Sequence, residues 1–269
     1  MQDLSRHLEK LGPFPLDPLT KKDNAEFNNL MCQFREMAGF EPLKGQLLTK
    51  DTDNAKLAKS NTHSVGLSLA PANTSGNWNT CRHSSKGCRD LCLATAGNGR
   101  YPKSQLARNW RTELLAAHPA LFLRALADAL RTEVKKHGKI NFRFNIISDL
   151  RVEIFCPDLL TLKGVNAYDY TKYPSDKRTT SDRYKLVGSV HENHTPKQIK
   201  GMIESYGSVA VVINRRKNEP FPATWLGYKI VDGDLSDDRT QSNETKTIIG
   251  LRPKGKAVGT DSKFVRNLA

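Results

Sequence analysis

The chain lacks the features that place a protein in a membrane or in an oxidising compartment. Among its 269 residues, no apolar run approaches the roughly 18 to 20 residues that cross a bilayer. Residues 1–22 contain no apolar core of the kind that directs secretion. Disulfides are rare in a reducing cytosol, so the five cysteines are predicted to be thiols or metal ligands. We therefore expect a cytoplasmic protein with no membrane partner.

Acidic residues are also scarce. The chain carries 42 Lys and Arg against 28 Asp and Glu, which gives a net charge of +14 and a pI near 9.6. A positive field of this size attracts polyanions through counterion release, and nucleic acid is the commonest polyanion of the cytosol. Zinc-finger, helix-turn-helix and RNA-recognition signatures are missing. The composition thus predicts a nucleic-acid partner or substrate, with solubility or a small phosphorylated ligand as alternatives.

The order of apolar segments predicts an α/β fold. Residues 1–62 form a polar, helical N-terminal extension, in which 24–37 has the spacing of one amphipathic helix. From residue 63 onward, short apolar runs alternate with helical segments, which favours a mainly parallel sheet. We predict an irregular or incomplete β/α (TIM-like) barrel over 63–269. Its strands are expected at 64–69, 140–147, 165–170, 184–190, 208–213, 227–231 and 246–251, and its helices at 104–117, 119–137 and 195–206.

Polar residues follow nearly every predicted strand. Parallel α/β folds place their chemistry at the carboxyl ends of the strands, so these residues are expected to converge on one site. The candidates for catalysis are Asp149, Asp169, Asp232 and Asp234. The candidates for substrate binding are Asn145, Ser148, Lys172, Asn214, Arg215 and Arg252. Any single one could be an ordinary loop residue, but together they suit acid/base or nucleophilic chemistry on an anionic substrate.

Four further cations are predicted to contact nucleic acid. Arg108 and Arg111 lie one helical turn apart after the cysteine-rich segment, and Arg216 and Lys217 follow a predicted strand. Guanidinium and ammonium groups in such positions bind phosphate oxygens. The alternative for the arginine pair is a solvated helix face.

Three cysteines are close together in the loop 78–97. Cys81, Cys88 and Cys92 have the spacing C-x6-C-x3-C, and thiolates bind zinc and iron–sulfur clusters strongly. We predict either zinc, with His83, His63 or Cys156 as the fourth ligand, or a [4Fe–4S] cluster. A loop after the first barrel strand is also where radical S-adenosylmethionine enzymes hold their cluster, although their cysteine spacing differs. Free structural thiols are the alternative.

Several longer runs resemble a known family. The segments LSLAPANTSG, TCRHSSKGCRDLCLATAGNGR, FRFNIISDL, YDYTK and IIGLRPKG resemble the gene product 88 family of bacteriophage and plasmid proteins, over roughly residues 64–258. More distantly, the chain is similar to DpdA-type DNA-guanine transglycosylases and through them to tRNA-guanine transglycosylases. That similarity implies an irregular β/α barrel, a zinc held by cysteines and a histidine, and aspartates at strand ends.

The distant resemblance implies an exchange of guanine for a 7-deazaguanine in DNA, by which some phages evade restriction. One aspartate would attack C1′ of a flipped-out nucleotide and expel guanine, and a second group would protonate the leaving base and deprotonate the incoming one. Asp149 with Asp232 or Asp234 would fill these roles, and Asp169 or Asn145 would read the base edge. The cytoplasm of a phage-infected or plasmid-bearing bacterium is the expected location.

Two other classes of function stay open. One is a radical S-adenosylmethionine-like iron–sulfur enzyme acting on nucleic acid. The other is a DNA-binding protein that a structural metal stabilises and that has no catalytic activity.

Overall fold

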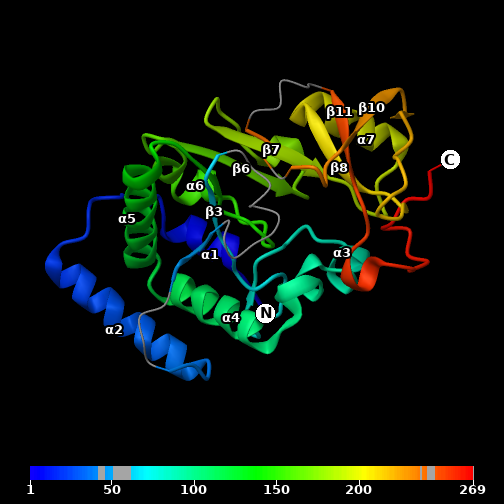
Figure 1. The fold of residues 1–269 in the computed structure, drawn as a ribbon. Coiled ribbons are helices and arrows are strands. Elements are labelled where there is room, and N and C mark those ends of the chain that lie inside the picture. Colours follow the sequence, from blue (N-terminus) through cyan, green and yellow to red (C-terminus); the bar gives the residue numbers. More distant parts are fainter. Residues whose placement is uncertain (42–45, 51–61, 237, 241–245, 269) are drawn as a thin grey trace.

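A largely parallel sheet forms the centre of the computed structural model, which describes residues 1–41, 46–50, 62–236, 238–240 and 246–268 (Figure 1). Within these residues nine strands pair in the order β2-β3-β5-β6-β7-β8-β11-β10-β9. They are β2 (Leu48–Lys50), β3 (Ser64–Leu67), β5 (Ile140–Arg143), β6 (Val165–Thr171), β7 (Tyr184–Ser189), β8 (Ser208–Val212), β9 (Thr224–Trp225), β10 (Tyr228–Asp232) and β11 (Thr247–Leu251). A separate two-stranded pair joins β1 (Gln2–Asp3) to β4 (Trp78–Asn79).

The prediction of a mainly parallel sheet is confirmed. All pairs from β3 through to β10 are parallel, and β2 and β9 add antiparallel strands at the two edges. The strands from β3 to β8 follow chain order, but β11 then returns between β8 and β10. The described strands form an open sheet, and no pairing among them closes a barrel. Alternating strands and helices give the same sequence pattern in open and closed sheets, so the pattern did not distinguish them.

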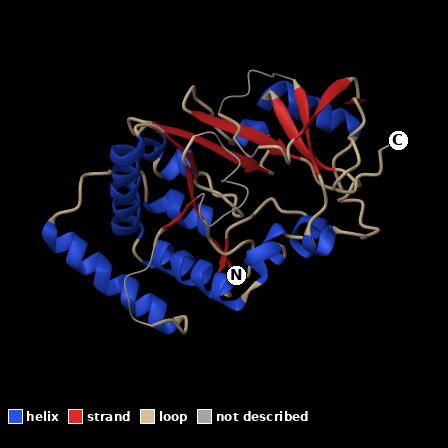
Figure 2. Ribbon diagram, viewed as in Figure 1, coloured by secondary structure: helices blue, strands red, loops and turns tan. Residues whose placement is uncertain are grey.

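Seven α-helices accompany the described strands (Figure 2). They are α1 (Leu4–Leu11), α2 (Lys21–Met37), α3 (Lys86–Asp90), α4 (Pro102–Ala117), α5 (Pro119–His137), α6 (Val152–Phe155) and α7 (Pro196–Tyr206). Local signals explain where the long helices begin. Thr20 with Asp23, and Thr195 with Gln198, form capping boxes, and Pro119 is the first residue of α5. None of the described helices combines the length and apolar character needed to cross a membrane.

The N-terminal helices belong to the main hydrophobic core. Leu4 and Leu8 of α1, and Phe27 and Met31 of α2, are buried in the same cluster as side chains of α4, α5, β3, β5 and β6. Figure 1 shows α2 and α5 at one end of the molecule and β10 and β11 at the other. Residues 1–41 thus pack on the same core as the segment that follows them. The domain boundary at residue 62 stays a prediction.

The two faces of the second half of the sheet have different partners. Val209 and Val211 of β8 pack with α7, whereas Ala210, between them, points to the opposite face together with Val187 and Ile249. This alternation follows from the two-residue period of a strand. The face of the sheet that carries Ala210 points away from α7, and it forms a wall of the cavity described next.

Candidate functional site

A cavity of about 200 Å³ opens at the carboxyl ends of the parallel strands. Its walls come from the cysteine-bearing segment 81–93, the loop after β5, the ends of β6, β7, β8 and β11, and the C-terminal residues Ala257 and Phe264. The structure brings many predicted site residues together here: Cys81, Cys88, Cys92, Asn145, Ser148, Asp149, Lys172 and Arg252 all line the cavity. Strand ends and the cysteine loop therefore contribute to one site.

The cysteine segment is anchored to the loop after β5. The Thr80 hydroxyl donates to Ala70 O (2.6 Å), and Thr80 O accepts from Asp149 N (2.9 Å). Cys81 Sγ accepts from the backbone N–H of Ala72 (3.2 Å) and lies 3.6 Å from Ile147 O. These bonds place the first thiol beside the Asp149 loop.

Glu192, in the loop after β7, holds the helix that carries Cys88. Its carboxylate accepts from the Ser85 hydroxyl (2.6 Å) and from Gly87 N (2.7 Å), and the Ser85 hydroxyl accepts from Cys88 N (3.1 Å). A Cβ on Gly87 would lie 2.8 Å from Glu192 Oε2, so only glycine admits the carboxylate this close. Contacts distant in sequence thus set the position of Cys88.

The three thiols are neighbours but do not all lie within 4.8 Å of one another. Burial raises the pKa of Cys81 to about 12 and raises that of Cys92, and the nearby Cys88 raises both further. Ligands around a single zinc lie about 3.8 Å apart, given tetrahedral Zn–S bonds of about 2.3 Å. Thiolates of an iron–sulfur cluster bind different iron atoms and are spread more widely. The three thiols are therefore candidate ligands for either a zinc ion or an iron–sulfur cluster.

The loop after β5 is shaped by a buried Asn–Asp pair. Asp169 is fully buried and accepts from Asn145 N (2.7 Å) and Asn145 Nδ2 (3.0 Å). Asn145 Oδ1 in turn accepts from the Ser148 hydroxyl and from Leu150 N. Burial raises the pKa of Asp169 to about 6, although the nearby Arg143 opposes this shift. Asp169 therefore lies behind the cavity wall and holds the loop, and β5 ends at Arg143 instead of the predicted residue 147.

Asp149 lines the cavity with its carboxylate already engaged. It accepts from Lys172 N (2.8 Å) and forms an ion pair with Arg178 Nη1 (2.9 Å). The Arg178 side chain is completely buried and also pairs with Glu153 (2.6 Å). The protein itself thus already provides partners for both oxygens of the Asp149 carboxylate.

Asp232 and Asp234 lie at the rim and do not line the cavity. Both pair with Arg252, at 2.8 Å and 3.5 Å, and Asp234 also pairs with Lys254. Arg252 further donates to the backbone of Arg216. These contacts join the ends of β10 and β11 to the loop after β8.

Lys172 lines the cavity and has no ion-pair partner in the described part of the chain. Its Nζ donates to the Ser189 hydroxyl (2.6 Å) and lies 5.7 Å from the Phe264 ring centroid. Arg143 and Tyr170, which the sequence did not single out, also line the cavity, with the guanidinium 4.7 Å from the ring centroid. The only signal for them was their place at strand ends.

The remaining predicted residues lie outside the cavity. His83 packs on Tyr173, with ring centroids 4.2 Å apart, and its pKa is lowered by burial. Cys156 is buried in the main core, and His63 precedes β3 at its amino end. Asn214, Arg215, Arg216 and Lys217 follow β8, where Asn214 and Arg215 contact Asn267 and Leu268. Arg216 and Lys217 are exposed.

The predicted arginine pair is engaged in internal contacts. Arg108 is buried, donates to Gly99 O (2.9 Å), and leaves its Nε without a hydrogen-bond partner. Arg111 donates to Gln46 O and packs on Trp110, and burial lowers its pKa to about 10. Arg108 lies close enough to Cys92 to favour its thiolate, although burial has the larger effect on that thiol. Both arginines thus organise the structure around α4.

The sequence of most of the chain matches a protein-family model. The model is described as "Gene product 88", and it matches residues 46–268. No curated protein and no solved structure matches the chain. The matched range includes the cysteine segment and the strands whose ends form the cavity.

Proposed function

The chain belongs to the gene product 88 family, and from that premise we propose that it is an iron–sulfur enzyme of the radical S-adenosylmethionine-like kind that acts on an anionic substrate. The observation that carries the proposal is the position of Cys81, Cys88 and Cys92 in the wall of one basic cavity. The cysteines follow β3, the first parallel strand, as the sequence order requires for such enzymes. Nucleic acid is the substrate class that the net charge of +14 favours.

The donor set supports a cluster over a closed zinc site. Three thiols line the cavity, and their Sγ atoms do not all lie within 4.8 Å of one another, whereas the ligands of one tetrahedral zinc are about 3.8 Å apart. Neither His83, Cys156 nor His63 lines the cavity as a fourth ligand. A cluster held by three cysteines keeps one iron open, and when bound it supplies single electrons to a ligand at that iron.

The residues around the thiols fit an anionic substrate group. Lys172 offers an ammonium with no carboxylate partner in the described residues, and Ser189 orients it. Tyr170 and Phe264 add aromatic walls against which a base or another planar group can pack. Asp149, which pairs with Arg178, is the one carboxylate of the cavity wall among the described residues, and it can accept a hydrogen bond or a proton from the substrate.

Anaerobic purification tests the proposal directly. We expect the wild-type protein to be brown and to contain iron and acid-labile sulfide, and Cys88→Ser to lose most of both. Cys32→Ser is the matched control, because Cys32 lies on α2, away from the cavity. A colourless protein that contains zinc at the three cysteines would refute the cluster.

Exchange of guanine for a 7-deazaguanine is the second candidate function. It is supported by Asn145, Ser148 and Asp149, which line the same cavity. Its weakness is that Asp149 is already paired with Arg178 and that Asp232 and Asp234 pair with Arg252 at the rim.

Nucleoside analysis of DNA and RNA from expressing cells separates the candidates. Base exchange predicts a 7-deazaguanine that disappears with Asp149→Asn but does not depend on bound iron. The cluster enzyme predicts a modification that disappears with Cys88→Ser. Nucleic-acid binding with unmodified nucleosides in every sample would favour the non-catalytic binding protein.

A further inference from the structure

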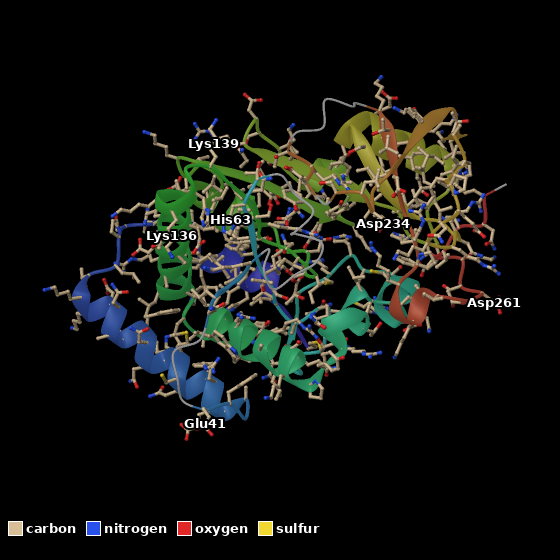
Figure 3. The ribbon with its side chains drawn as sticks, in the orientation of Figure 1. Glu41, His63, Lys136, Lys139, Asp234 and Asp261 are labelled. Carbon is tan, nitrogen blue, oxygen red and sulfur yellow. The ribbon has the colours of Figure 1, made fainter. Side chains whose placement is uncertain are left out.

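A group of side chains of the types that can bind metals lies at the amino end of the sheet. Glu133 and His137 are in the last two turns of α5, and His63 directly precedes β3. One ligand atom from each lies within 4.8 Å of the other two. Figure 3 shows His63 on the side of the view where α5 lies, and Asp234 on the other side. This group is therefore separate from the cysteine cavity.

The geometry converges on one carboxylate oxygen. Glu133 Oε2 lies 3.1 Å from His63 Nε2 and 3.8 Å from His137 Nε2, and the two imidazoles stack with centroids 3.8 Å apart. Glu133 and His137 are four residues apart, so they share one face of α5. Tertiary packing brings His63 to the same point from the sheet.

Glu133 is 5% exposed, so its charge needs a cation nearby. Lys50 provides one, but its Nζ is 2.8 Å from Oε1, the other oxygen of the carboxylate. Oε2 faces the two histidines instead. Two imidazoles and one carboxylate are a donor set that binds Zn²⁺ and related divalent metals, with further positions open to water.

We propose that His63, Glu133 and His137 bind a divalent transition metal of the zinc class. The metal ties the end of α5 to the start of β3. The site is independent of the proposed iron–sulfur function, since it uses none of the cavity residues. The competing explanation is an ion-paired cluster in which protonated histidines neutralise Glu133.

Cobalt titration of metal-free protein distinguishes this site from the cysteines. Thiolate ligation of Co²⁺ gives intense charge-transfer bands, whereas the His–Glu–His site gives only weak d–d bands. We expect His137→Gln to remove the weak bands and to lower zinc affinity at this site by at least about 100-fold. Loss of a residue that only hydrogen-bonds to a metal ligand lowers affinity by at most about 100-fold, so a larger loss indicates a direct ligand. Cys88→Ser is expected to lose the charge-transfer bands and to keep the weak ones.

Lys50→Gln separates metal binding from a plain ion-pair cluster. The substitution removes a cation that competes for Glu133, so we expect zinc to bind severalfold more tightly and to raise the melting temperature at least as much as in the wild type. His137 is 41% exposed at its side chain, so His137→Gln is expected to fold normally. Equal zinc affinity and unchanged cobalt spectra in wild type, His137→Gln and Lys50→Gln would overturn the proposal.

Discussion

Arg178 joins several buried polar groups around the site. Its guanidinium binds Asp149, Glu153, Thr171 and Tyr184, and its side chain is completely buried. Tyr184 donates to Asp169, which holds Asn145. One arginine therefore connects the wall of the cavity to the buried Asn–Asp pair behind it.

Replacing Arg178 by Met is expected to destabilise the fold strongly. The change leaves Asp149 and Glu153 buried without their cation, and breaking a buried pair in this way costs about 3 to 5 kcal/mol. Urea unfolding monitored by circular dichroism measures the loss. Lys86→Met removes the exposed pair between Lys86 and Asp90 and should cost no more than about 1 kcal/mol. Similar losses in the two variants would contradict the role given to Arg178.

At the scale of elements, the loop after β7 connects the sheet to the cysteine segment. His194 Nδ1 accepts from His191 N, and His191 Nδ1 accepts from Asn193 N, both at 3.2 Å. Both rings must be unprotonated at these atoms to accept. Glu192, between the two histidines, holds Gly87. The loop is therefore built around neutral imidazoles.

The histidine pair makes stability depend on pH. Burial lowers the pKa of His194 from 6.5 to about 4. The nearby His191, Lys172 and Arg266 add to this shift, and Glu192 opposes it. The unfolded chain then binds more protons between these values, so stability should rise from about pH 4 to 6.5 and be lost as the pH falls.

Urea midpoints measured across this pH range test the dependence. His194→Asn keeps an acceptor near Nδ1 but does not titrate, so its midpoint should vary less with pH. An identical pH dependence in wild type and variant would rule out His194 as the source.

Two glycine substitutions are expected to have opposite effects. In Gly87→Ala the new Cβ would lie 2.8 Å from Glu192 Oε2, which displaces the carboxylate and loosens the helix that carries Cys88. We expect lower stability and faster reaction of the thiols with a thiol reagent. Gly201, inside α7, has open space where its Cβ would be, so Gly201→Ala should stabilise the protein by about 0.5 to 1 kcal/mol. Unchanged thiol reactivity in Gly87→Ala would contradict the role given to the contact between Glu192 and Gly87.

At the scale of the whole molecule, charge is the strongest indication of a partner. Arg216 and Lys217 are exposed after β8, close to Arg252 at the rim. If they bind phosphate, Arg216→Gln with Lys217→Gln should reduce the salt dependence of DNA binding, by a slope of about 0.9 for each phosphate that is no longer neutralised. Filter binding at several salt concentrations measures this slope.

The control removes the same charge elsewhere. Lys21 and Lys22 are exposed on α2, which Figure 1 shows at the other end of the molecule. Lys21→Gln with Lys22→Gln should leave the slope nearly unchanged. Equal effects of the two double variants would indicate non-specific attraction by net charge alone.

The sequence by itself determined the long helices, most of the strands and the grouping of the cysteines. Capping residues, prolines and apolar periods act locally, so α4, α5 and α7 and the parallel strands other than β5 were predicted close to their observed bounds. The convergence of the cavity residues also followed from sequence, because parallel strands end at one edge. Short elements such as α1 and β9 carry too little periodic signal and were missed.

Tertiary structure alone decided which strand-end residues face the cavity and whether the sheet closes. Asp149 and Asp169 both follow apolar runs, yet only Asp149 lines the cavity, because Asn145 and Tyr184 hold Asp169 behind the wall. The place of β11 between β8 and β10 depends on strand pairing, and the meeting of His63 with Glu133 depends on packing between α5 and the sheet. Such contacts join residues far apart in the chain, so no local pattern records them.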